Sequence, residues 1–62
     1  MKNNKMRIYE CIKNNPGIWM TKICDTLNLS YLTVHKWVKI LELEGKVTYN
    51  SVGVVKQLYI KN

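Results

Sequence analysis

The spacing of apolar residues changes at Gly45, and this change divides the 62-residue chain into two kinds of structure. Before Gly45 the apolar residues recur at intervals of three and four, the spacing of a helix with one buried face. After Gly45 apolar and polar residues alternate, the spacing of a strand with one buried face. We therefore expect an α+β fold that begins with helices and ends in a β-hairpin.

The first part of the chain predicts a helix over about residues 4–14, followed by a short strand. Pro16 ends the helix, because proline has no N–H to donate and its ring clashes with the preceding turn. Residues 18–20 are too few for a helix and rich in strand formers, so we expect a short strand there. The apolar face of the first helix consists of Ile8, Cys11 and Ile12.

Two residues with capping side chains predict where the next helices begin. The side-chain oxygens of Thr21 and Ser30 can accept hydrogen bonds from the free N–H groups at a helix start. We therefore expect a second helix over about residues 22–28 and a third over about residues 31–44. Gly45 ends the third helix, because glycine adopts left-handed backbone at little cost. The buried face of the third helix is expected to comprise Val34, Trp37, Val38 and Leu41.

The alternating pattern after Gly45 predicts a β-hairpin over about residues 46–61. Gly53 lies in the middle of this segment and marks the turn. Residues 18–20 are available as a third strand, which would give a small three-stranded sheet.

The chain is strongly basic for its size. Ten Lys and Arg residues stand against four Asp and Glu residues, a net charge of +6. This charge favours a polyanionic partner, and the alternative is a surface that is merely basic. In the expected third helix Lys36 and Lys39 precede the acids Glu42 and Glu44, which occur only in the last turn. The N-terminal part of that helix is therefore suited to meet phosphate.

The composition disfavours several classes of protein. No apolar run approaches the about 18 residues of a membrane span. The charged N-terminus does not resemble a secretion signal, so we expect a soluble cytoplasmic protein. Four scattered acids and one histidine give no catalytic constellation, so no enzyme is expected. No small-molecule ligand or cofactor is evident either.

Cys11 and Cys24 are the only cysteines. Two cysteines and one distant histidine do not make a zinc site, which needs four ligands in its structural form. We expect two reduced thiols that serve as small core residues. A disulfide between them is the alternative, if the first two helices are adjacent.

A longer pattern covers the segment "NNPGIWMTKICDTLNLSYLTVHKWVKILELEGKV". Its fixed places are filled by Pro16, Gly17, Thr21, Leu29, Ser30, Val34, Val38, Leu41, Glu42 and Gly45. This pattern resembles the shared core of small bacterial and archaeal winged-helix repressors, such as the ArsR and MarR groups. Cys24 stands where that core usually has Ala, and Asn28 where it usually has Gly. Asn tolerates the left-handed turn geometry better than most residues.

The resemblance implies a single winged helix-turn-helix domain over residues 1–62, with three helices, a short strand and a hairpin called the wing. It also implies a small transcription regulator that binds specific sequences of double-stranded DNA. Its third helix would enter the major groove, which is wide enough to admit a helix. The candidate contacts at the start of that helix and on its outward side are Ser30, Tyr31, Leu32, Thr33, His35, Lys36 and Lys39.

Two further sets of candidate DNA contacts lie outside the third helix. Thr21 and Lys22 are candidates for the phosphate backbone, because the N-terminus of a helix offers free N–H groups and positive potential. The wing is expected on the backbone or in the minor groove. Its candidate residues are Asn50, Ser51, Gly53 and Lys56.

Two alternatives to sequence-specific DNA binding stay open. One is a winged-helix module for protein–protein contact, which the apolar hairpin tip and Trp19 favour. The other is a non-specific DNA-binding protein. Trp19 and Tyr9 are the candidates for a dimer or partner surface. A homodimer is the natural partner, because twofold symmetry suits palindromic DNA sites.

Overall fold

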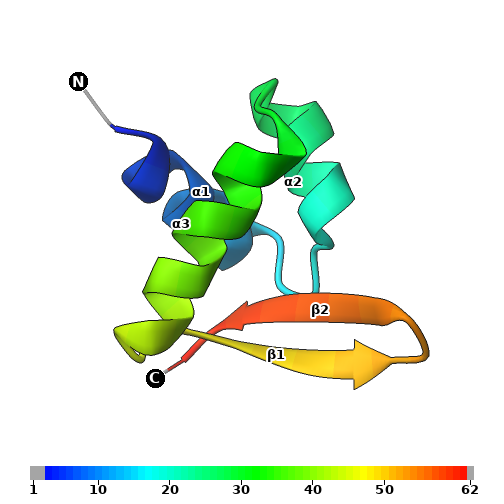
Figure 1. Cartoon of the computed structure of the whole chain (residues 1–62). Helices are drawn as coiled ribbons and strands as arrows, with labels where there is room; N and C mark the ends of the chain where they lie inside the picture. Colours follow the sequence, from blue (N-terminus) through cyan, green and yellow to red (C-terminus); the bar gives the residue numbers. More distant parts are fainter. Residues whose placement is uncertain (1–2, 62) are drawn as a thin grey trace.

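The computed structural model describes residues 3–61 of the chain. Three helices come first and an antiparallel hairpin follows, and Figure 1 shows the helices on one side of the hairpin. This order confirms the predicted fold class. The elements are α1 (Asn4–Asn14), α2 (Met20–Leu27), α3 (Tyr31–Leu43), β1 (Val47–Val52) and β2 (Val55–Ile60).

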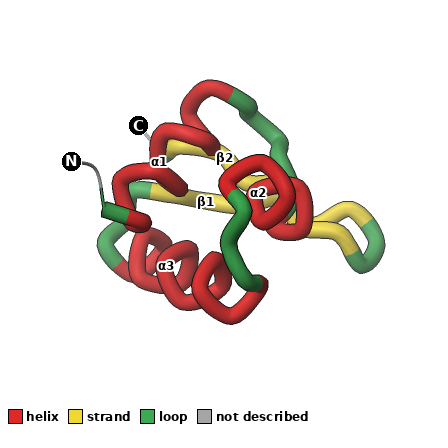
Figure 2. Tube along the Cα trace, turned by 90° about the horizontal axis from the view of Figure 1, so that it is seen from above, coloured by secondary structure: helices red, strands yellow, loops and turns green. Residues whose placement is uncertain are grey.

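The hairpin ends in a turn that lies beyond α2 (Figure 2). Its strands pair in register from Val47 opposite Ile60 to Val52 opposite Val55. The two-residue turn between them has Gly53 in its first position with φ 62°, a conformation that glycine adopts without strain. Figure 2 shows this turn extending past α2, so the tip of the wing projects from the body of the molecule.

The predicted strand over residues 18–20 is wrong in extent. Ile18 alone forms a bridge to Leu58, and within residues 3–61 the sheet has two strands. α2 already begins at Met20, because Trp19 adopts extended backbone and its carbonyl accepts the first hydrogen bond of the helix. A short apolar run suits a strand or a buried helix equally well by spacing alone. Here the helical form packs Met20 against the core.

The predicted N-cap of the second helix is also wrong. Thr21 lies exposed in the first turn of α2, and Trp19 holds the N-cap position without a side-chain hydrogen bond. The predicted range of about 22–28 therefore starts too late. The helix ends before Asn28, whose backbone is left-handed with φ 57° and ψ 48°. Asparagine is among the few residues other than glycine that adopt this conformation readily.

The hydrophobic core lies between the three helices and one face of the hairpin. Trp37, predicted as part of the core, is half-buried at its edge. Cys11 and Val47 are nearly enclosed. Every element except β1 contributes to the fully buried set, which comprises Ile8, Ile12, Ile23, Val34, Val38, Leu41 and Leu58.

Both cysteines are free thiols, and no disulfide joins them. Cys11 is buried in the core and Cys24 is half-buried against it. Burial raises the pKa of both thiols, because the thiolate would lose its hydration. They are therefore small core residues with little nucleophilic character at neutral pH.

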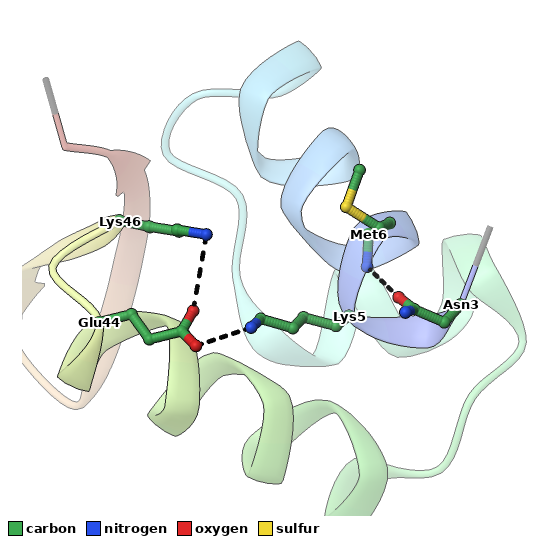
Figure 3. Close-up of polar contacts among 5 residues, drawn as sticks. All are labelled: Asn3, Lys5, Met6, Glu44 and Lys46. Atoms are coloured by element: carbon green, nitrogen blue, oxygen red, sulfur yellow. Dashed lines mark hydrogen bonds and ion pairs between the residues drawn. The ribbon is translucent and has the colours of Figure 1, made fainter.

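Polar contacts on the surface join the start of α1 to the end of α3. Lys5 Nζ lies 2.7 Å from Glu44 Oε2, and Lys46 Nζ lies 3.8 Å from Glu44 Oε1 (Figure 3). The hydrogen bond from Lys5 lowers the pKa of the Glu44 carboxyl, so that group is ionised at neutral pH. Asn3 Oδ1 accepts a hydrogen bond from the Met6 N–H at 2.9 Å and so caps α1.

Among residues 3–61, none of the helices has both the length and the apolar character that crossing a bilayer requires.

Two leucines of α3 give a matched test of the core. Leu41 is 1% exposed and Leu32 is 80% exposed. Leu41→Ala should lower the free energy of unfolding by about 2–5 kcal/mol, because it loses buried area and leaves a cavity. Leu32→Ala should change it by less than about 0.5 kcal/mol. Urea unfolding followed by circular dichroism measures both values, and similar losses in the two variants would contradict the described packing.

Candidate nucleic-acid interface

The outward side of α3 carries most of the predicted contacts. Val34 and Val38 are fully buried, and they turn the opposite side of the helix to solvent. Leu32 is 80% exposed and Tyr31 is 52% exposed. The remaining exposed candidates of this helix are His35, Lys36 and Lys39. The structure therefore brings these five side chains together on one surface that has no acid before Glu42.

Ser30 and Thr33 belong to the cap of α3. Ser30 Oγ accepts a hydrogen bond from the Thr33 N–H at 3.2 Å and donates one to Thr33 Oγ1 at 2.9 Å. This is the predicted N-cap, and it sets the direction in which the first turn of α3 presents its side chains. Thr33 is half-buried and accepts a hydrogen bond at Oγ1, so its own hydroxyl hydrogen is available to another acceptor.

Aromatic rings hold several of the polar side chains in place. The Tyr31 and His35 rings stack with centroids 6.0 Å apart and planes at 27°. Lys36 Nζ lies 4.6 Å from the centre of the Trp37 ring. These contacts are weak individually, but they limit the conformations of side chains that would otherwise be mobile at the surface.

The wing meets the helices in a groove of about 390 Å³ between the start of α2, the start of α3 and the hairpin turn. We call it the wing groove. None of the described residues that line it is acidic. Lys56 contributes a cation, and its Nζ lies 4.1 Å from the centre of the Tyr49 ring. The lining residues are Trp19, Met20, Thr21, Tyr31, His35, Val54, Val55 and Lys56.

The N-terminus of α2 opens beside this groove. Its N-cap residue Trp19 makes no side-chain cap hydrogen bond, so the first N–H groups of the helix are available to an anion. Thr21 lines the groove and Lys22 is exposed in the same first turn. Of the two predicted backbone contacts, Thr21 therefore shares the groove with the wing residue Lys56, and Lys22 follows it in the same turn of α2.

Other predicted residues lie apart from the wing groove. Asn50, Ser51 and Gly53 are exposed on the hairpin and do not line the groove. Tyr9 lies in a second groove of about 340 Å³ at the other end of α3. Trp19 and Tyr9, predicted for a partner surface, therefore belong to two separate grooves. The second groove is lined by Lys5, Met6, Tyr9, Leu41, Gly45, Lys46 and Lys61.

Three residues of the wing groove are absent from the predicted contacts: Met20, Val54 and Val55. The sequence predicts a strand at Met20, and it does not indicate how close the hairpin turn comes to α2. The apolar tip was visible in the sequence, and Val54 is fully exposed there.

Arg7, the only arginine of the sequence, lies outside the exposed surface of α3 and makes a structural contact. Arg7 Nη2 donates a hydrogen bond to the Leu27 carbonyl at 3.0 Å, where α2 ends. It thereby satisfies one of the free carbonyls of that helix end. The exposed face of α3 therefore relies on lysines for its positive charge. No group of His, Cys, Asp and Glu side chains that would hold a metal ion occurs in the part of the chain that the structure describes.

Comparison with known protein families identifies the class of this domain. A family model described as winged helix-turn-helix DNA-binding matches residues 1–48, which is most of the chain. The chain therefore belongs to this family of winged helix-turn-helix DNA-binding domains, as the sequence predicted. No curated protein matches the sequence.

Solved structures show the same fold. The transcriptional regulator SlyA has a TM-score of 0.85 and 20% sequence identity over 100% of this chain. The protein BT2368 from Bacteroides thetaiotaomicron has a TM-score of 0.83 and 21% identity over 92% of this chain. This chain spans 45% of the SlyA chain and 70% of the BT2368 chain. At these identities the likeness shows the fold alone.

Two substitutions of the N-cap residue Ser30 test whether its side chain stabilises α3 through the cap hydrogen bond. Ser30→Ala should lower the free energy of unfolding by about 1 kcal/mol, because the Thr33 N–H loses its acceptor. Ser30→Asp should stay within about 0.5 kcal/mol of the parent, because aspartate is an equally good N-cap. Thermal and urea unfolding measure both variants. A Ser30→Ala variant as stable as the parent would contradict the capping role.

Proposed function

We propose that the protein binds specific sequences of double-stranded DNA and acts as a small transcription regulator in the cytoplasm. In this proposal α3 enters the major groove, and the wing lies on the adjacent backbone or in the minor groove. The observation that carries it is the exposed, acid-free surface of α3. Membership of a DNA-binding family supports the same conclusion.

The side chains of α3 divide into base and phosphate contacts by their chemistry. Lys36 is the best donor for guanine, and the highly exposed Leu32 suits the thymine methyl group. Lys39 lies one turn further along α3 and is a candidate for phosphate. Hydrogen bonds to bases or phosphates would come from Ser30, Tyr31, Thr33 and His35.

The phosphate backbone would be held from both sides of the wing groove. Thr21 and Lys22 lie at the uncapped N-terminus of α2, where an anion is favoured. Lys56 lines the same groove as Thr21, from the wing. The exposed hairpin residues Asn50, Ser51 and Gly53 would follow the backbone or the minor groove. With arginine absent from α3, DNA shape would contribute to specificity beside direct contacts.

A second candidate function is protein–protein contact, and the second groove favours it. Met6 is 46% exposed there beside the half-buried Tyr9. An exposed apolar surface of this kind is suited to a partner, and a second copy of the chain is the partner we propose. This contact is compatible with DNA binding, because the groove lies at the opposite end of α3 from the wing groove.

Removing two lysines of α3 tests the major-groove proposal. The double variant Lys36→Ala, Lys39→Ala should bind duplex DNA about fivefold or more weakly. The slope of log affinity against log salt should become shallower by about 1 to 2, because each phosphate contact accounts for about 0.9. Fluorescence anisotropy over a series of salt concentrations measures both quantities.

The matched control is Lys13→Glu, which changes the net charge by the same two units at an exposed position outside α3 and both grooves. It should stay within about twofold of the parent in affinity. If Lys13→Glu lost as much affinity as the double variant, net charge alone would account for binding, and the proposed position of α3 in the major groove would be refuted. Binding that does not weaken with salt would instead favour the protein-contact function.

Selection from random duplexes, followed by footprinting, tests sequence specificity. We expect one enriched motif whose protected positions include the major groove. A motif with twofold symmetry would support the homodimer, because each half-site would then face one copy of α3. Recovery of unenriched sequences would refute specific recognition and leave a non-specific DNA-binding protein.

A further inference from the structure

The wing groove contains exposed aromatic rings whose faces a paired duplex would leave uncovered. Trp19 is 49% exposed and Tyr31 is 52% exposed, and both line the groove with His35. They share the groove with the apolar side chains of Met20, Val54 and Val55, and an exposed surface of this kind is suited to a partner. A further ligand surface is therefore expected to cover them.

A paired duplex offers these rings little to stack on. It presents phosphates, sugars and base edges, while the faces of its bases are covered by their neighbours. An unpaired base presents its face, and stacking of one base on an aromatic side chain typically changes affinity about fivefold to 150-fold. The chemistry of the groove thus fits a base that has left the duplex stack.

We infer that the wing groove binds a nucleobase that is unpaired or turned out of the duplex, at the edge of the surface that contacts paired DNA. The inference rests on the proposed DNA binding and adds a structural preference to it. Trp19 and Tyr31 are the stacking residues.

The charge of the groove suits the phosphates on either side of such a base. Its lining within residues 3–61 contains no acid, and Lys56 lies on its wing side. The Lys56 Nζ lies 4.1 Å from the centre of the Tyr49 ring, so the cation is held near the hairpin. Thr21 adds a hydroxyl on the opposite wall. A nucleotide in the groove would therefore meet apolar, aromatic and positive groups together.

The size and position of the groove agree with a single nucleotide. Its volume of about 390 Å³ lies at the lower end of the range for small-ligand sites. Tyr31 and His35 belong both to the groove and to the exposed surface of α3. A base leaving the stack beside α3 would therefore be close to the groove. Because turning out a base costs least where it is already unpaired, the preference should be strongest for a bulge.

The test compares a paired duplex with the same duplex carrying one bulged 2-aminopurine. We expect the protein to bind the bulged duplex about fivefold or more tightly, as measured by fluorescence anisotropy. The fluorescence of the 2-aminopurine should fall on binding, because an aromatic ring quenches a base stacked on it. Equal affinity for the two duplexes, with unchanged 2-aminopurine fluorescence, would overturn the inference and leave the proposed function intact.

Two substitutions of Trp19 test whether its ring acts by stacking on the base or in another way. Trp19→Leu should abolish the preference for the bulge while affinity for the paired duplex stays within about twofold, and Trp19→Phe should keep most of the preference. If Trp19→Leu weakened binding to both duplexes equally, Trp19 would be a contact to the DNA backbone. That result would overturn the inference. Circular dichroism checks that the variants fold. Trp19→Met gives the same test if Trp19→Leu does not fold.

A second variant distinguishes this site from the proposed reading surface. Lys36→Ala, Lys39→Ala should weaken both duplexes by a similar factor and leave their ratio unchanged. A parent protein that bound neither duplex would refute the proposed DNA binding and the nucleobase site together.

Discussion

The arrangement of this domain depends on two backbone hydrogen bonds between β2 and the segment before α2. The Gly17 N–H donates to the Leu58 carbonyl at 2.8 Å, and the Leu58 N–H donates to the Ile18 carbonyl at 3.0 Å. They hold the hairpin against the helices while the Leu58 side chain is fully buried in the core. Gly17 has φ 88°, and a Cβ there would lie 3.3 Å from Tyr59 Oη, so glycine is required at this contact.

This connection has a consequence for the surface. Because β2 is fixed beside the start of α2, the wing turn lies near the first turns of both α2 and α3, and the wing groove forms between them. The basic residues fall into two groups according to where they lie. Arg7 and Lys5 make contacts that join α1 to α2 and α3, whereas Lys36, Lys39 and Lys56 are directed to solvent around the proposed DNA surface.

The sequence predicted the elements best where one local residue decides a boundary. Ser30 caps α3 and Gly45 follows its end with left-handed backbone, as the side-chain chemistry of each residue indicates. The prediction failed at residues 18–20, where α2 begins instead of a strand. It also failed at Thr21, because Trp19 holds the N-cap position although Thr21 has the better capping side chain. Packing of Met20 against the core outweighed the local capping preference, which is worth only about 1 kcal/mol.

By itself, the sequence determined the order of helices and hairpin, the side of α3 that faces solvent and the absence of acids from most of that side. These properties follow from residue spacing and local chemistry, which act over a few positions of the chain. Tertiary structure alone decided that Trp19, Tyr31 and Lys56 share one groove while Tyr9 lies in another. The physical reason is that these positions depend on contacts between segments distant in sequence, above all the hydrogen bonds at Leu58.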